Sequence, residues 1–278
     1  MIKYVIGLIL ICSSMFGQTL MWSENRISEI SHEPQRAVGD NIRSTGATLS
    51  HLAMGGTWET VLNVINLNET TPSKTEIQFF DPSGKRMEVS FRQAGTNNVA
   101  TGTVILVTLP PRGTMDLVSV QSNNLRVGWA KFDHVSKYTD TTFGGESTVQ
   151  LVFRETVPNA PQKEAVVLPD WSLDKKIVTQ YNNTNGFVSS IALCNSSSYS
   201  DLSLIITISD ENGNILVTKY ETLKIGNQIA FETTNRWPET RNRKGTIIVT
   251  SSNYGLGSLV LLFNPTGSLT SSQFYGID

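Results

Sequence analysis

The residue types best suited to acid–base or metal chemistry are few in this chain and scattered. Its three histidines, His32, His51 and His134, lie far apart in the sequence. None belongs to a His-Glu-x-x-His pattern, and no two have the short spacing of zinc ligands on one element. The sequence therefore predicts no metal site, although ligands that meet only in the folded chain would leave no such pattern.

Motifs for nucleophilic catalysis and for phosphate binding are also missing. No Gly-x-Ser-x-Gly elbow occurs. The stretch Gly144-Gly145-Glu146-Ser147 is rich in glycine, but no phosphate-binding Lys-Ser or Lys-Thr pair follows it. Carboxylate pairs for glycoside hydrolysis are defined by distance in space and cannot be selected by spacing. We therefore expect a protein that is not an enzyme and uses no cofactor, with a hydrolase of unrecognised site as the alternative.

Two aspartate-led stretches have oxygen-bearing side chains that could suit calcium. Asp210, Asn212 and Asn214 form one of them, and the related stretch Asp81-Pro82-Ser83-Gly84 forms the other. A calcium loop needs several more ligands and usually a distant glutamate. Asp at the first position and Gly at the left-handed position are typical of tight turns. Both stretches therefore predict hairpins with a type I turn and a bulge.

Tryptophans are the side chains that could contact a ligand by stacking, because both faces of the indole ring are apolar and can lie against a sugar ring. Trp58 and Trp129 lie within expected strands, which favours a place in the core. Trp171 and Trp237 lie in expected loops, next to Asp170 and Pro238 respectively. Trp171 and Trp237 are therefore the candidate ligand contacts, and packing over the end of the domain is the alternative for each.

The elements that would position these residues are short strands. Hydrophobic residues make up 39% of the 278 residues and charged residues 17%, which leaves enough apolar side chains for a core. Many short apolar runs broken by turn residues, with no sustained helical period, indicate an all-β sandwich or barrel. The expected strands cover residues 59–67, 73–81, 87–92, 104–109, 114–119, 125–132 and 148–154, and then 165–168, 176–182, 187–195, 202–210, 215–223, 228–232, 245–250 and 257–263.

The second set of strands repeats the first. A shift of 129 positions places Asn66 on Asn195 and Asp81 on Asp210. Later in the module the shift changes, and Leu109 then resembles Leu223. Two modules of one design account for this self-similarity.

The N-terminus has the order of a secretory signal peptide. A short positive start, with Lys3, precedes an apolar run, and small residues up to Gly17 favour cleavage before Gln18. The run is too short for a stable membrane anchor. Cys12 raises the alternative of a lipoprotein signal, but Ile11 stands where such signals need a small residue. After cleavage only Cys194 remains, in an apolar setting that predicts a buried thiol.

Several motifs resemble a tandem immunoglobulin-like β-sandwich module of uncharacterised secreted bacterial proteins. They are Gly55-Gly56-Thr57-Trp58, Phe79-Phe80-Asp81, Leu109-Pro110-Pro111-Arg112-Gly113, Val127-Gly128-Trp129-Ala130, Asn183-Thr184-Asn185-Gly186-Phe187, Asp210-Glu211-Asn212-Gly213 and Phe263-Asn264-Pro265-Thr266-Gly267. The resemblance covers about residues 47–272. It implies an exported all-β protein and brings no catalytic residues with it.

These observations predict a signal peptide (1–17), a flexible leader (18–45), one β-sandwich (46–157), a linker (158–164) and a second β-sandwich (165–278). Net charge is −2, with no basic block for nucleic acid, and no membrane span is expected after cleavage. We expect a secreted, periplasmic or cell-surface protein that binds through loops, with extracellular polysaccharide or an envelope protein as partner. The alternative is an accessory subunit that pairs through a strand edge.

Overall fold

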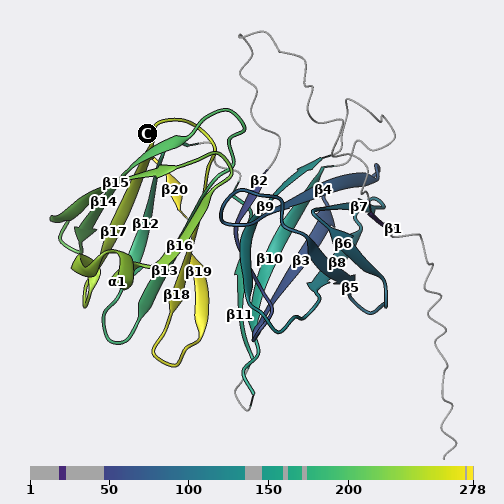
Figure 1. The fold of residues 1–278 in the computed structure, drawn as a ribbon, viewed down its shortest axis with the longest axis horizontal. Helices are drawn as coiled ribbons and strands as arrows, with labels where there is room; N and C mark the ends of the chain where they lie inside the picture. Colours follow the sequence, from purple (N-terminus) through teal and green to yellow (C-terminus); the bar gives the residue numbers. More distant parts are fainter. Residues whose placement is uncertain are drawn as a thin grey trace, which may run out of the picture.

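The computed structural model of the chain is all-β, with two β-sandwiches side by side (Figure 1). The structure describes residues 19–22, 47–134, 146–158, 162–170, 174–272 and 274–277. The expected signal peptide, residues 1–17, lies outside the described residues. The prediction of two tandem antiparallel sandwiches is confirmed.

The first sandwich consists of sheets A and B. In spatial order, sheet A contains β1 (Thr19–Trp22), β7 (Val104–Leu109), β4 (Ser73–Phe80), β9 (Arg126–His134) and β2 (Ala47–Met54). Sheet B contains β11 (Lys163–Val167), β10 (Ser147–Glu155), β3 (Trp58–Asn66), β8 (Thr114–Ser119), β5 (Val89–Gln93) and β6 (Val99–Gly102). Alternate residues along β4 and β10 are buried, because successive side chains of a strand point to opposite faces.

The second sandwich consists of sheets C and D. Sheet C contains β15 (Ile215–Leu223), β14 (Leu202–Asp210), β17 (Lys244–Ser251), β12 (Lys176–Asn182) and β20 (Tyr275–Gly276). Sheet D contains β16 (Gln228–Glu232), β13 (Val188–Asn195), β18 (Leu256–Phe263) and β19 (Leu269–Ser272). Two short helical turns, α1 (Thr233–Arg236) and η1 (Pro238–Thr240), join sheet D to sheet C.

The internal repeat is visible in the strand order. The order β7-β4-β9-β2 in sheet A matches β15-β14-β17-β12 in sheet C, and β11-β10-β3-β8 matches β19-β18-β13-β16. The buried asparagines also match: Asn66 donates from Nδ2 to the carbonyl of Thr71, and Asn195 donates from Nδ2 to the carbonyl of Ser200. A shift of 129 positions relates both the donors and the acceptors.

The two aspartate-led turns form as predicted, but only the second joins the expected hairpin, between β14 and β15. After the first turn, β4 and β5 enter different sheets, and only Phe80 and Arg86 pair beside it. Gly84 and Gly213 adopt φ of 84° and 83°, and each donates its N–H to the carbonyl of Asp81 or Asp210 at 3.0 Å. The Asp81 carboxylate accepts the N–H of Ser83, and the Asp210 carboxylate accepts the N–H of Asn212. Hydrogen bonds to the charged form lower the pKa of both carboxyls, for Asp210 above all the bond from the Asn214 amide. The carboxylate oxygens of Asp81 and Asp210 therefore stabilise the two turns.

Several elements differ from the prediction: β2, β6, β19 and β20 form where no strand was expected, and α1 and η1 where no helix was expected. Two further differences concern pairing. The strand expected at residues 165–168 forms as β11, but it pairs with β10 of the first sandwich and not with the second module. The connection from β10 is short enough for a hairpin, and ion pairs such as Lys163–Glu155 add to it. Thr19–Trp22, expected to be part of a flexible leader, form β1 on the edge of β7.

A seam joins the two sandwiches. Sheet D faces the first sandwich, and sheet C lies on the far side (Figure 1). Ala192, Leu259 and Leu261 of sheet D share a hydrophobic cluster with the core of the first sandwich. Gln228 donates from Nε2 to the carbonyls of Ser50 and Gly128, at 2.6 and 3.0 Å. The sandwiches are therefore linked by apolar packing and by buried hydrogen bonds.

Candidate binding surface

The outward face of sheet C is broad, nearly uncharged and flanked by two exposed tyrosines. Strand register defines its members: Ser203, Ile205 and Thr207 on β14; Thr218, Tyr220 and Thr222 on β15; Thr246, Ile248 and Thr250 on β17; Lys176, Val178 and Gln180 on β12; and Tyr275 on β20. We call this set the outer face. Lys176 is the one charged residue among these thirteen, and Lys244, which the same alternation places at the end of this face on β17, is paired with Glu211. Hydroxyls, methyl groups and aromatic rings make up most of the surface.

The two tyrosines lie at opposite sides of the outer face. Tyr220 pairs with Ile205 and is 76% exposed, while Tyr275 pairs with Val178 and is 65% exposed. They lie on β15 and β20, the two edge strands of sheet C. Four strand spacings separate these edges, which corresponds to about 19 Å. An extended ligand that lies across the strands would contact both rings.

Charges on β15 are kept off this face by the alternation of the strand. Lys219 and Glu221 point to the other side, where Lys219 Nζ lies 3.0 Å from Glu239 Oε1 and Arg236 lies 2.5 Å from Glu221 Oε1. Both partners come from the helical turns α1 and η1. The segment between β16 and β17 therefore neutralises the inward charges of the edge strand, and the outward residues are left uncharged.

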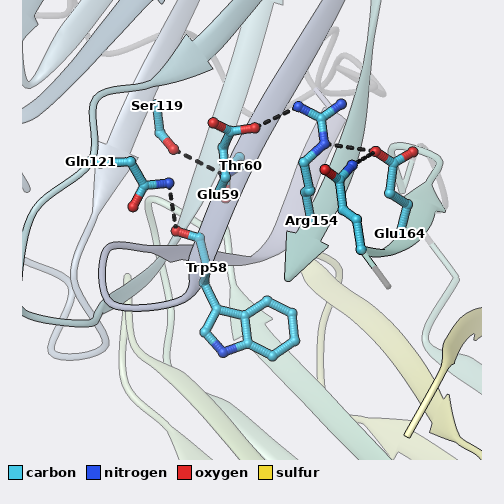
Figure 2. A network of polar contacts seen from close by, with 8 residues as sticks. Trp58, Glu59, Thr60, Ser119, Gln121, Arg154 and Glu164 are labelled. Atoms are coloured by element: carbon cyan, nitrogen blue, oxygen red, sulfur yellow. Dashed lines mark hydrogen bonds and ion pairs between the residues drawn. The ribbon is translucent and has the colours of Figure 1, made fainter. Parts of the chain in front are cut away.

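The outward side of sheet B provides a contrast. Figure 2 shows Arg154 of β10 between Glu59 of β3 and Glu164 of β11, with ion pairs of 2.5 and 2.6 Å. The hydrogen bond from Arg154 lowers the pKa of the Glu164 carboxyl, which favours its ionised form. The row crosses three strands in register and holds β11 to the first sandwich. These charges are already paired with one another, and the pairs stabilise sheet B.

Trp237 does not provide the exposed ring that was expected of it. Trp237 is 1% exposed and packs edge-on to Phe231, with ring centroids 4.7 Å apart. It lies where α1 ends and η1 begins, and Pro238 at the start of η1 helps turn the chain so that the ring enters the core of the second sandwich. The proposed ligand contact at Trp237 is therefore corrected: the side chain is a core residue. Trp171 lies outside the described residues.

Trp58 and Trp129 follow the core prediction to different degrees. Trp129 is 2% exposed, stacks on Phe80 at 4.4 Å, and donates from Nε1 to the carbonyl of Gly226 across the seam. Trp58 is only half-buried, and it packs edge-on to Phe153. Figure 2 shows its indole directed away from the Arg154 row. Both indole rings therefore contribute to packing within the protein.

Two groups with large pKa shifts, His51 and Cys194, lie in the seam. Burial lowers the pKa of His51 to about 4, and Gln228 Nε2 lies 3.1 Å from its Nδ1. Burial raises the pKa of the Cys194 thiol to about 12, which confirms the prediction of a buried thiol. His51 is thus neutral and Cys194 protonated near pH 7. His32 lies outside the described residues, as does the side chain of His134.

Sequence reasoning missed the tyrosines because it looked for tryptophan in loops. The signal was the alternation Thr218-Lys219-Tyr220-Glu221-Thr222, which places tyrosine with threonine on one face and both charges on the other. Four of the five tyrosines in the described part of the chain are exposed, and all four belong to the second sandwich: Tyr199, Tyr220, Tyr254 and Tyr275.

Comparisons with known proteins identify no family for this chain. No protein-family model matches it, and a search of curated proteins finds no match. Within the described ranges, no cluster of three or more His, Cys, Asp or Glu side chains could hold a metal ion. None of the helices in the described part of the chain is long and apolar enough to cross a membrane.

Proposed function

We propose that this protein is an exported, non-catalytic binding protein that holds an extended polysaccharide on the outer face of sheet C. The observation that carries the proposal is the pair of exposed tyrosines, Tyr220 and Tyr275, at the two sides of a face with few charges. Polysaccharide is favoured because a sugar ring offers an apolar face to an aromatic ring and hydroxyls to the threonines between them. The sequence supports export through the signal peptide pattern of residues 1–17.

The rigid sheet suits this role better than loops would. Side chains on paired strands are held by the ladder, so little conformational freedom is lost when a ligand binds. A tyrosine ring adds a large contact area at the cost of only two side-chain torsions. A flat array of this kind matches a long, repetitive ligand better than a small molecule, which needs a deep pocket.

Pairing through the edge of β15 is less well supported. Lys219 and Glu221 on this edge strand point inward and are charged. Inward-pointing charges are a means by which edge strands avoid pairing with other chains. The accessory-subunit alternative therefore has no favourable observation at this edge.

Sedimentation with insoluble polysaccharides tests the proposal. The chain comprising residues 18–278 is mixed with cellulose, chitin and calcium pectate, and the bound fraction is measured for the unmodified chain and for a Tyr220→Ala, Tyr275→Ala variant. We expect binding to at least one polymer, and a loss of affinity of roughly tenfold or more in the variant, because two stacking contacts are removed.

Tyr199→Ala is the matched control. Tyr199 is 85% exposed, more than either tested tyrosine, but it lies in the loop between β13 and β14. The control variant should bind as the unmodified chain does. The proposal fails if no polymer retains the protein, or if the double variant and the control bind equally well.

A further inference from the structure

An open polar cleft lies at one end of the second sandwich, at the end of the outer face. Its volume is about 670 Å³, and it lies among the β12–β13 turn, the β14–β15 turn and the segment before β17. Asn185, Asn212 and Arg243 line it, one from each of these segments. Lys244 also lines it, two residues before Thr246 of the outer face. The cleft and the outer face therefore share strands, and one ligand can extend from one to the other.

The rim of the cleft is held in a defined shape. Asn185 and Asn242 adopt the left-handed conformation, with φ of 53° and 55°. Asparagine accepts this conformation more readily than most residues. Behind the rim, the buried Asn183 donates from Nδ2 to Thr233 Oγ1 and Thr240 Oγ1, at 2.8 and 3.0 Å. A ligand would meet loops that are already ordered.

Arg243 is the charged side chain of the cleft without a hydrogen bond or ion pair to a described residue, and it shares the cleft with the carboxylates of Asp210 and Glu211. Lys244 Nζ lies 2.9 Å from Glu211 Oε2, and the Asp210 carboxylate accepts hydrogen bonds from Asn214 and from the turn. The guanidinium of Arg243 makes no hydrogen bond or ion pair with any described residue. The same holds, within the described part of the chain, for the side-chain amides of Asn185, Asn212 and Asn242. A guanidinium with neighbouring amides is a suitable donor set for a carboxylate and its adjacent hydroxyls.

We infer that this cleft binds the carboxylate of an acidic sugar residue, so that the polysaccharide held by the outer face is a uronate-containing one. This inference rests on the proposed function and specifies its ligand class. Arg243 makes the paired contact with the carboxylate, and the amides of Asn185, Asn212 and Asn242 bind sugar oxygens. The polar lining and open shape suit a hydrated sugar and not an apolar ligand.

The test compares two ligands that differ only in the carboxylate. Titration calorimetry measures the affinity of residues 18–278 for a trigalacturonate and for its carboxyl-reduced form, trigalactose. We expect the acidic trisaccharide to bind at least tenfold more tightly. Arg243→Gln should remove this preference, and Arg243→Lys should keep part of it, because lysine retains the charge but not the paired geometry.

Arg241→Gln is the matched control, because Arg241 is exposed nearby but donates from Nε to the carbonyl of Thr234. It should leave the preference unchanged. Equal affinity for the two trisaccharides in the unmodified chain overturns the inference. Competition by acetate as strong as that of galacturonate also overturns it, since the cleft would then be a general anion site.

The same variants separate this inference from the proposed function. If the Tyr220→Ala, Tyr275→Ala variant keeps its full affinity for the polymer while Arg243→Gln loses the acidic preference, the outer face is refuted and the cleft stands. If the tyrosine variant loses the polymer while Arg243→Gln keeps the preference, the cleft is refuted and the outer face stands.

Discussion

The buried asparagines Asn66 and Asn195 each join the end of a central strand to the loops around it. Asn195 donates from Nδ2 to the carbonyls of Ser200 and Leu223, at 2.9 and 3.0 Å, and accepts the N–H of Ser197. Asn66 does the same with Thr71, Pro110 and Asn68. Each amide thus satisfies backbone groups that would otherwise be unpaired.

Truncation of Asn195 should be costly. We expect Asn195→Ala to lower the free energy of unfolding by roughly 1–3 kcal/mol, since buried carbonyls lose their donor. Chemical denaturation measures the change. Asn98→Ala is the control, because Asn98 is exposed and bonds through its backbone N–H. Similar losses for both variants would contradict this role of Asn195.

The His51 ring makes the stability of the protein depend on pH. Its pKa is lowered from 6.5 to about 4 by burial, so the unfolded chain binds the proton more readily than the folded one. Stability contributed by the neutral ring is therefore complete above about pH 6.5 and falls as the pH drops toward 4. The full shift in pKa would correspond to a loss of about 3 kcal/mol. The actual loss is smaller, because the ring is only half-buried.

Denaturation midpoints between pH 4 and 7 measure this effect. A His51→Gln variant keeps a polar side chain without a titrating group, and its stability should change less over this range. The account of His51 is wrong if both proteins lose stability equally between pH 6.5 and 4.

At the residue scale the sequence predicted turns better than surfaces. Asp81, Gly84, Asp210 and Gly213 have roles fixed by local backbone geometry, and the structure confirms them. Whether an aromatic ring is exposed depends on which way the whole chain turns. Trp237 sits in a helical segment and enters the core, while Tyr220 sits on an edge strand and remains exposed.

At the scale of elements, β1 covers an edge that is otherwise apolar. Ile105 and Val107 of β7 are fully buried, whereas the matching positions of β15 are the charged Lys219 and Glu221. The β15 edge is thus protected by charges, and β7 is protected by the pairing of β1.

Loss of β1 should therefore cause self-association. We expect Thr19→Pro, Met21→Pro to release β1, because proline cannot donate to the ladder. The exposed edge of β7 should then pair between molecules, which light scattering would detect as dimers or larger species. The Thr19→Ala, Met21→Ala variant retains the backbone N–H donors, and it should keep the oligomeric state of the unmodified chain. A proline variant that stays in the same state as the alanine variant would refute this role of β1.

For two strands, the sequence did not predict which sheet they join. Residues 165–168 have the pattern of a strand, but the pattern does not say which neighbour it joins. The charges of Lys163 and Glu164, opposite Glu155 and Arg154, favour the first sandwich. Thr19–Trp22 are too short to show a period, and only the open edge of β7 explains their pairing.

At the scale of the whole molecule, the seam couples the two sandwiches. Trp129 Nε1 donates to the carbonyl of Gly226, and Gln228 Nε2 donates to two carbonyls of the first sandwich. Gly84 and Gly226 approach so closely that a Cβ on Gly226 would lie 3.1 Å from Gly84 Cα. The repeat predicted two modules, but not this seam, because its residues are far apart in the sequence.

The seam should make unfolding cooperative. We expect the unmodified chain to unfold in one transition by denaturant, and the Trp129→Phe, Gln228→Ala variant to unfold in two, as coupling of a few kcal/mol is removed. Fluorescence and circular dichroism, recorded together, distinguish the two cases. Separate transitions in the unmodified chain would show that the sandwiches are not coupled.

The central claim concerns the place where the ligand lies, and oxidative footprinting measures this without any substitution. Residues 18–278 are bound to the polysaccharide that sediments them, exposed to hydroxyl radicals and analysed by mass spectrometry. The account predicts that Tyr220 and Tyr275 are protected while the more exposed Tyr199 is oxidised as in the free protein. Protection confined to the first sandwich, or to Tyr199 and Tyr254, would contradict it.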